Sequence, residues 1–357
     1  MAYRPRHAGQ ALIVIAAAYV VAASALSGVE AQGTAITTVR RYQMGTSTEV
    51  RAWGGDPATR TAAIDDAFAA FADVDRMMSN YRDDSELARV NRDAARGPVP
   101  VSEPLFRVIQ AADLVSRQSN GAFDITVGPL VRLWGFHDHK PHVPSARELD
   151  VVGPLVNFRN VMLDEDARTV RFVRPGTELD LGGIGKGFAV ELAAAALRAR
   201  GLSGFIDAGG NQYLLGQPLG KATWTVGVRD PDNADGLLGT LAVPEGSVST
   251  SATYANFLTM NGRKYGHILD PRTLMPSDAS VSVTIWSPDG TLADALSKAA
   301  FVLGRERGLA LIDSMPRTMG LIAYRDTDGH VATIMSAGLR GAFHSVKPRP
   351  PVSSHKP

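Results

Sequence analysis

Residues 179–187, which contain Gly182, Gly183, Gly185 and Gly187, have a composition suited to an anion. They lie between a predicted strand and a helix predicted over 186–200. Glycines let the backbone approach a ligand closely, and the free N–H groups at the start of a helix attract negative charge. A bound phosphate group is one interpretation of this pattern, and close packing of the helix on the strand is the other.

This segment matches neither of the two common glycine motifs for nucleotides. A Walker A loop needs a glycine five positions before its Gly-Lys pair, where this chain has Asp180. It also needs Ser or Thr after the lysine, where this chain has Gly187. The spacing is not that of the dinucleotide-binding G-x-G-x-x-G motif either. The segment therefore indicates a phosphate without naming the nucleotide.

Three further side chains suit acid–base or ligand chemistry, and each has a structural alternative. Asp294 begins a predicted helix, where free amide groups favour a carboxylate, so it is a ligand or a simple helix cap. His267 lies in a predicted turn and is either a general base or a structural histidine. Asp124 either binds a ligand or turns the chain. No serine and aspartate are placed to form a catalytic triad with a histidine.

The composition excludes several classes of protein. Of the 357 residues, 45% are hydrophobic and 20% are charged, which is typical of a folded globular chain. Lys and Arg number 37 against 36 Asp and Glu, so the formal net charge is +1. A chain with a net charge so close to zero has no overall electrostatic field to attract nucleic acid, and we expect no nucleic-acid partner. The absence of cysteine excludes disulfides, cysteine-bound zinc and a thiol nucleophile.

Residues 1–31 have the layout of a secretory signal peptide. Two arginines precede an uncharged run over 11–26, and a cleavage site follows before Gln32. We therefore expect an exported protein, periplasmic or otherwise extracytoplasmic. The alternative is an uncleaved anchor that associates the protein with the inner membrane. Without cysteine the chain cannot be a lipoprotein.

Helical and alternating hydrophobic periods predict an α+β protein with mixed, mainly antiparallel sheets, built as one large domain over residues 32–344. Hairpins over 161–173 and 320–335 favour antiparallel pairing. Residues 137–155 are predicted to form a loop or lid, and the proline-rich residues 345–357 a disordered tail. The other expected helices cover 61–78, 103–119, 186–200, 292–303 and 305–314, and the other expected strands 44–53, 205–207, 224–228, 237–243 and 281–286.

Seven segments, taken together and in order, resemble the ApbE family of FAD:protein FMN transferases from about Met44 to about Leu303. No single segment is decisive, and the resemblance rests on their common order and spacing. They are Met44-Gly45-Thr46; Met78-Ser79-Asn80-Tyr81-Arg82 with Asp84-Ser85-Glu86-Leu87; residues 121–130 with Leu133-Trp134-Gly135-Phe136; residues 180–187; Ala208-Gly209-Gly210-Asn211; residues 267–273; and residues 293–297.

The resemblance implies an enzyme that binds FAD with Mg²⁺, joins FMN through its phosphate to a Thr or Ser hydroxyl of an acceptor protein, and releases AMP. The implied acceptors are subunits of membrane redox pumps or extracytoplasmic flavoproteins, so membrane contact would come through a membrane-bound acceptor or an uncleaved anchor. A hard cation suits a pyrophosphate, and histidine suits deprotonation of a hydroxyl.

The resemblance also assigns roles to individual residues. The metal ligands it implies are the Gly183 carbonyl and Asp294, which is thereby catalytic, and His267 is implied to be the base. The residues implied to line FAD are Met44, Tyr81, Ala122, Phe123, Asp124, Asp180, Lys186 and Ile268, the last through its backbone.

One position departs from the family pattern. Four residues after Asp294 the family usually has a threonine whose hydroxyl binds Mg²⁺, and here the residue is Lys298. A protonated ammonium has no lone pair for a metal, but at this helical spacing it can pair with Asp294. Three alternatives follow: the metal keeps fewer protein ligands and more water, Ser297 takes the place of the threonine, or the charge of Lys298 partly replaces the metal.

Two other functions stay open. An FAD pyrophosphatase would use the same site but pass FMN to water, which gives free FMN and AMP. A non-catalytic FAD-binding protein is favoured if Lys298 abolishes metal binding. Residues 249–253 faintly resemble the threonine-containing acceptor motif that the family modifies. We interpret this as a coincidence, with self-flavinylation as the alternative.

Overall fold

The computed structural model describes residues 35–138, 140, 142–233, 235–252, 257–260 and 263–346. The predicted signal peptide and residues 347–357 of the predicted tail lie outside these ranges. Within the described ranges, no helix is both long enough and apolar enough to cross a membrane.

Helices and strands alternate in blocks along the chain. The α-helices are α1 (Pro57–Met78), α2 (Glu86–Asp93), α3 (Glu103–Gln118), α4 (Gly128–Leu133), α5 (Ala146–Val152), α6 (Gly185–Ala199) and α7 (Gly290–Ser314), with 3₁₀ turns η1 (Ile125–Val127), η2 (Gly153–Leu155), η3 (Phe158–Asn160) and η4 (Ala337–Leu339). The strands are β1 (Thr37–Gln43), β2 (Thr46–Trp53), β3 (Val99–Pro100), β4 (Val161–Asp164), β5 (Thr169–Phe172), β6 (Ser203–Ala208), β7 (Asn211–Leu215), β8 (Trp224–Arg229), β9 (Leu237–Val243), β10 (Gly246–Ala252), β11 (Phe257–Met260), β12 (Arg263–Gly266), β13 (Leu269–Asp270), β14 (Met275–Pro276), β15 (Ser282–Ser287), β16 (Met319–Arg325), β17 (Val331–Met335) and β18 (Phe343–Ser345).

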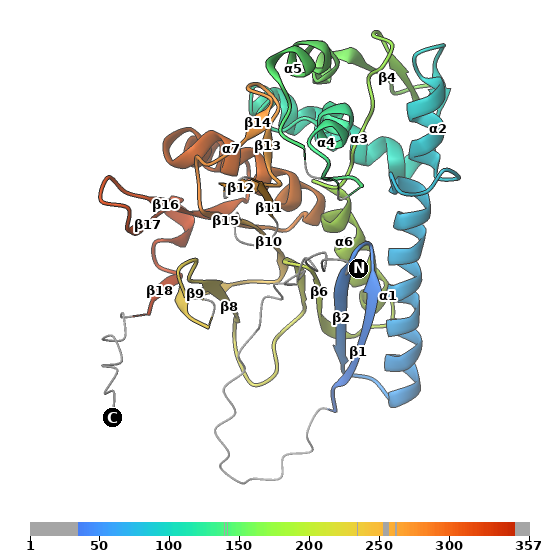
Figure 1. Cartoon of the computed structure of the whole chain (residues 1–357). Helices are drawn as coiled ribbons and strands as arrows, with labels where there is room; N and C mark the ends of the chain where they lie inside the picture. Colours follow the sequence, from blue (N-terminus) through green and yellow to red (C-terminus); the bar gives the residue numbers. More distant parts are fainter. Residues whose placement is uncertain are drawn as a thin grey trace, which may run out of the picture.

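An eight-stranded sheet in the order β1-β2-β6-β7-β10-β15-β16-β17 forms the centre of the fold (Figure 1). Each neighbouring pair of its strands is antiparallel. Helices α6 and α7 pack against this sheet, and α1 and α3 pack in turn against α6 and α7. The prediction of an α+β fold with mainly antiparallel sheets is therefore confirmed.

Apolar side chains are buried on both faces of this sheet. The main core lies between the sheet and the helices, where Ile64, Phe68 and Phe71 of α1 form the apolar face that their three- and four-residue spacing predicts. A second core, which contains Phe205, Trp224 and Trp286, joins the central sheet to the small sheet β18-β9-β8. The central sheet is thus covered on one face by helices and on the other by strands.

The structure differs from the predicted elements at several places. The predicted loop over 137–155 contains α5, which Ser145 caps by accepting from Glu148 N–H. Strands β7 and β10 are not predicted, and the strand expected from Met44 begins only after a turn at Met44 and Gly45. The predicted break between helices 292–303 and 305–314 is confirmed, because Gly304 inside α7 has a non-helical backbone (φ 74°, ψ −172°). Ser345 of the predicted tail ends β18, and Val346 N–H donates to the Leu238 carbonyl (3.1 Å).

The glycine turn between β6 and β7 is built around a buried carboxylate, Asp207. Its side chain accepts from Gln212 Nε2 (2.7 Å) and from the N–H groups of Gly210 and Gly209, and only 8% of the residue is exposed. Burial raises the pKa of Asp207 to about 6, although these hydrogen bonds oppose the rise. The glycines at 209 and 210 have positive φ angles (62° and 92°), so the turn needs them for its backbone as well.

Replacing Asp207 with asparagine is expected to change how stability depends on pH. The pKa of about 6 in the folded protein exceeds the ordinary value of 3.8, so the folded state binds this proton more tightly than the unfolded state. The wild type should therefore lose up to about 3 kcal/mol relative to Asp207→Asn as the pH rises from 4 to 7. Urea unfolding of both proteins at several pH values measures this difference. A difference that stays constant over that range would contradict the burial of a titrating carboxyl group.

Candidate functional site

The glycine-rich segment leads into α6 and is held from outside by a side chain of α2. In the described chain the last strand before it, β5, ends at Phe172, so the strand predicted directly before this segment is wrong. Asn91 donates through its side-chain amide to the Leu179 carbonyl (3.0 Å) and accepts from Leu179 N–H (2.8 Å). Asp180 Oδ1 accepts from Gly182 N–H (2.8 Å). The N-cap residue of α6 is Ile184, whose apolar side chain cannot accept a hydrogen bond from the first N–H groups of the helix.

Asp294 lies one turn inside α7 and joins this helix to the start of α6. Its side chain is fully buried, and Oδ2 accepts from Gly187 N–H (2.8 Å). A β-carbon built on Gly187 would lie 2.1 Å from the Gly290 carbonyl oxygen, so the two helix starts touch. The residue that caps α7 is Asp289, which accepts from Leu292 N–H (2.8 Å). Asp294 therefore does not cap its own helix, and its hydrogen bond is to an N–H group in the first turn of α6.

Two lysines face this junction of helices. Lys298 pairs with Asp294 Oδ1, as their spacing predicts, and its side chain is only 20% exposed. Lys186, in the first turn of α6, donates to the Gly182 carbonyl (3.4 Å). Burial lowers the pKa of Lys298; the Asp294 carboxylate opposes this, and the positive charge of Lys186 lowers the pKa further. Gly187, which follows Lys186, donates its N–H to the carboxylate that pairs with Lys298, so Asp294 links the two segments that carry the lysines.

Ser297, the second candidate for a metal ligand, turns toward strand β10. Its Oγ donates to the Asp294 carbonyl (2.8 Å) and lies 2.7 Å from Ser251 Oγ and 3.2 Å from Ser249 Oγ. All three serines are buried. Burial of Ser249 and Ser251 inside the sheet argues against self-flavinylation at these two positions, while Thr253 lies outside the described residues.

Met44 and Phe123, both predicted to line FAD, pack on the glycine-rich segment. Met44 has a left-handed backbone (φ 46°) in the β1–β2 turn, and its Cε would lie 3.9 Å from a β-carbon built on Gly185. A β-carbon built on Gly183 would lie 3.1 Å from Phe123 Cε2, a contact tight enough to displace the ring. Ala122, next to Phe123, is buried in the main core. The structure thus brings these three residues to the segment that carries Lys186.

Tyr81 lies in the turn between α1 and α2. It is 70% exposed and stacks on His137, with ring centroids 4.5 Å apart and an interplanar angle of 14°. Burial of its hydroxyl and the charge of Asp180 raise the pKa of Tyr81, and Arg132 opposes the rise. The charge of Asp180 thus acts on the Tyr81 hydroxyl, and the resemblance implies that both residues line one ligand.

Asp124 has a structural role in the fold. Its Oδ1 accepts from Thr126 N–H (2.8 Å) and Thr126 Oγ1 (2.7 Å), and its Oδ2 accepts from Phe158 N–H (2.6 Å). Burial raises the pKa of Asp124, and these hydrogen bonds oppose the rise. Of the two interpretations given by the sequence, the structure favours the one in which this side chain turns the chain and so positions Phe123.

His267 and Ile268 lie in the connection between β12 and β13. His267 is half-buried, and the side chain of Ile268 belongs to the main core. The Ile268 carbonyl accepts from Ser277 N–H (2.9 Å), so this backbone oxygen is already used inside the protein. A contact between the Ile268 backbone and a ligand would therefore come from its N–H group.

Arg272 connects this segment to the residues around Phe123. Asp270 accepts two hydrogen bonds from the Arg272 guanidinium (2.9 and 2.8 Å). A β-carbon built on Gly121 would lie 3.9 Å from Arg272 Cγ, so the segment over 267–272 adjoins the one over 121–124. The motif that begins at Met44 and the one over 121–130 therefore contact the glycine-rich segment, and the motif over 267–273 adjoins the second of these.

Sequence reasoning missed three side chains that support the site, namely Asn91, Arg132 and His137. Arg132 binds Glu178 through Nε (3.0 Å to each carboxylate oxygen) directly before the glycine-rich segment. His137 follows the motif over 133–136, which was the one available signal for it. Asn91 and Arg132 contact residues far away in the sequence, and no spacing along the chain predicts such contacts.

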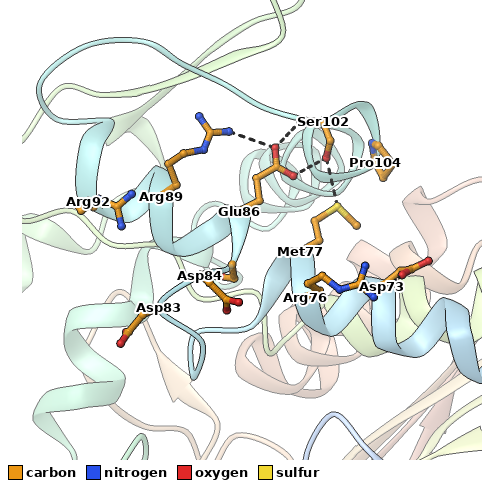
Figure 2. A pocket seen from close by; sticks show the side chains of 11 residues that line it. Asp73, Arg76, Met77, Asp83, Asp84, Glu86, Arg89, Arg92, Ser102 and Pro104 are labelled. Atoms are coloured by element: carbon orange, nitrogen blue, oxygen red, sulfur yellow. Dashed lines mark hydrogen bonds and ion pairs between the residues drawn. The ribbon is translucent and has the colours of Figure 1, made fainter.

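An open pocket of about 660 Å³ borders the turn that precedes α2 (Figure 2). Charged residues of α1, α2 and the turn between them line it, together with Ser102 and Pro104 at the start of α3, and several of these residues pair with each other. Glu86 accepts from the N–H and Oγ of Ser102 (both 2.6 Å), and Arg76 pairs with Asp73 (2.9 Å). The described residues that line this pocket include none of the site residues predicted from the sequence. It therefore does not contain the residues that the resemblance assigns to FAD, although Asp84, Ser85 and Glu86 belong to one of the seven segments.

The side chains at the implied metal site do not suit a divalent cation. Mg²⁺ needs oxygen ligands in near-octahedral geometry. One oxygen of Asp294 accepts from Gly187 N–H, the other pairs with the Lys298 ammonium, and Ser297 bonds within the serine cluster. A cation beside Asp294 would also be repelled by Lys298.

Elsewhere in the described ranges, one group of three acidic or histidine side chains lies within ligand distance of one another. It consists of Asp326, Asp328 and His330 in the exposed β16–β17 turn. Asp326 Oδ1 there accepts from the N–H groups of Asp328 and His330 (3.0 and 2.8 Å), which explains the cluster as turn geometry.

Fold and site together define an α+β protein in which Asp294 of α7 joins the glycine-rich start of α6 to Lys298. A model of the ApbE family matches residues 44–322, a range that contains every predicted site residue. The chain is 34% identical over 310 residues to an FAD:protein FMN transferase of Treponema pallidum, a match that covers 81% of this chain and 86% of that protein. It is 37% identical over 241 residues to an FAD:protein FMN transferase of Klebsiella pneumoniae, with 66% and 74% covered.

Solved structures agree with this match. The crystal structure of the ApbE protein from Thermotoga maritima superposes with a TM-score of 0.79 at 29% identity, covering 87% of this chain and 100% of that one. The flavin transferase ApbE from Vibrio cholerae gives a TM-score of 0.78 at 26% identity, with 87% and 100% covered. The chain belongs to the ApbE family.

Proposed function

We propose that this chain is an FAD:protein FMN transferase that attaches FMN through a phosphoester bond to a Thr or Ser hydroxyl of an acceptor protein. The hydroxyl oxygen attacks the phosphorus of the FMN half of FAD. The bond from that phosphorus to the bridging oxygen breaks, and AMP leaves with the bridging oxygen. The proton of the hydroxyl passes to a base, for which His267 is our candidate.

One observation carries this proposal beyond the family match. Asp294 joins the segments that carry Lys186 and Lys298 at the contact between α6 and α7, beside exposed backbone of a glycine-rich segment. Positive charge and helix N–H groups suit a diphosphate, and phosphoryl transfer depends mainly on positioning and electrostatic stabilisation. Met44 packs on the same segment, and the exposed ring of Tyr81, stacked on His137, offers further apolar surface for the flavin ring.

The place of action is also a proposal. The signal-peptide layout of residues 1–31 supports export, and we propose that the protein works in the periplasm or another extracytoplasmic space. Its acceptors would then be redox-pump subunits or flavoproteins with an exported domain. This fits the family chemistry, because the acceptor threonine or serine must meet the enzyme on the same side of the membrane.

The proposed function is tested by incubating the mature protein with FAD and a threonine-containing acceptor peptide, once with Mg²⁺ and once with EDTA. Mass spectrometry of the products separates the open functions. A peptide that gains the mass of FMN, with release of AMP, supports the transferase. Free FMN and AMP with an unchanged peptide would show a pyrophosphatase, and intact FAD bound to the protein would show a non-catalytic binder.

A further inference from the structure

The Asp294 carboxylate, which the family pattern offers to a metal ion, is already neutralised within the chain. Lys298 pairs with one oxygen, Gly187 N–H donates to the other, and no part of the Asp294 side chain is exposed. Ser249 Oγ adds a long contact to Oδ1 (3.5 Å). An ammonium group therefore lies beside the carboxylate, where a threonine hydroxyl would otherwise help to hold a cation.

Asp294 also joins the Lys298 ammonium to the start of α6, where helix N–H groups suit a diphosphate. The carboxylate that pairs with Lys298 accepts from Gly187 N–H, and the residue before Gly187, Lys186, donates to the carbonyl of exposed Gly182 (3.4 Å). Two positive charges at one contact between helices repel each other, and a bound anion beside them lowers that repulsion.

We infer that Lys298 takes the place of the metal ion in this chain, and that Lys298 and Lys186 hold the diphosphate of FAD without a divalent cation. The inference rests on the proposed function, since it concerns the same nucleotide. Lysine suits this task because its ammonium is a compact charge with three donors for phosphate oxygens. Asp294 then serves to position Lys298 and to join α6 to α7.

The test is FAD affinity, measured by titration calorimetry on the mature protein in EDTA and again in excess Mg²⁺. For the wild type we expect the two dissociation constants to agree within about threefold. Lys298→Met should bind FAD at least about tenfold more weakly than the wild type in both buffers. Lys298→Thr, which restores the family residue, should bind weakly in EDTA and recover at least about tenfold in Mg²⁺.

Two controls keep these outcomes interpretable. Lys221→Met removes an exposed lysine from the loop between β7 and β8, and it should bind FAD as the wild type does. Because Lys298→Met leaves a buried carboxylate unpaired, it could unfold. Asp294→Asn with Lys298→Met removes both charges and should show the same weak binding in both buffers, with the fold checked by circular dichroism.

Either of two results would overturn the inference. One is a wild type whose FAD affinity falls tenfold or more when EDTA replaces Mg²⁺. The other is a folded Lys298→Met protein, or a folded double variant, that binds FAD in EDTA as tightly as the wild type. Failure of the proposed function looks different: FAD would bind as expected in these titrations, while the acceptor peptide in the transfer assay would gain no FMN.

Discussion

Replacing Gly187 with alanine is expected to lower the free energy of unfolding by about 3 kcal/mol and to abolish FMN transfer. The added β-carbon would lie 2.1 Å from the Gly290 carbonyl oxygen and 2.5 Å from Asp294 Cβ. The nearest of these atoms belongs to the backbone of α7, so the two helices would have to separate. Separation would break the bond from Gly187 N–H to Asp294 and would move Lys298 away from Lys186. Urea unfolding and the FMN-transfer assay measure the two effects.

Gly185→Ala is the matched control for this prediction. Gly185 lies in the same turn of α6, but a β-carbon built there has Met44 Cε as its nearest neighbour at 3.9 Å, an ordinary contact. Alanine is also favoured over glycine inside a helix by about 1 kcal/mol. We therefore expect Gly185→Ala to be neutral or slightly stabilising. Equal destabilisation by both substitutions would show that the close contact between α6 and α7 does not limit position 187.

The helices could be predicted because their buried faces are apolar and periodic. Leu105, Ile109 and Ala112 of α3 show this pattern, and all three are buried. Strand β10 could not be predicted in this way, because its buried positions include Ser247, Ser249 and Ser251. Buried serines produce no periodic pattern of apolar residues. The fold accepts these serines since each Oγ finds a partner, as Ser247 does in the Gln212 carbonyl (2.8 Å). Patterns of apolar residues thus predict surface helices better than a polar strand in the centre of a sheet.

Sequence patterns likewise predict only part of the candidate site. The pairing of Lys298 with Asp294 was predictable, because residues four apart on a helix are neighbours. The bond from Gly187 to Asp294 was not, because it depends on how α6 and α7 pack on the sheet. The stacking of Tyr81 on His137 also joins segments whose relation only the folded chain defines. Contacts within one element therefore follow from spacing, whereas contacts between elements need the three-dimensional arrangement.

His267→Ala is expected to slow FMN transfer by about 10²–10⁴-fold while FAD affinity changes by less than about threefold. The physical reason is that a general base acts on the acceptor hydroxyl in the transition state and adds little to binding of the ground state. His267 suits this role because it is half-buried in a short connection next to the segment that contacts Gly121. Single-turnover transfer to the acceptor peptide gives the rate, and titration calorimetry gives the affinity.

Two other histidines separate a catalytic role from a general effect of losing an imidazole. His344→Ala removes an exposed side chain from β18 and should leave both rate and affinity unchanged. His137→Ala removes the ring that stacks on Tyr81, so it should weaken FAD binding more than it slows transfer from the bound state. If His267→Ala instead weakened FAD binding strongly and kept a normal single-turnover rate, His267 would be a binding residue, and the base for the acceptor hydroxyl would have to be sought among the other groups around the glycine-rich segment.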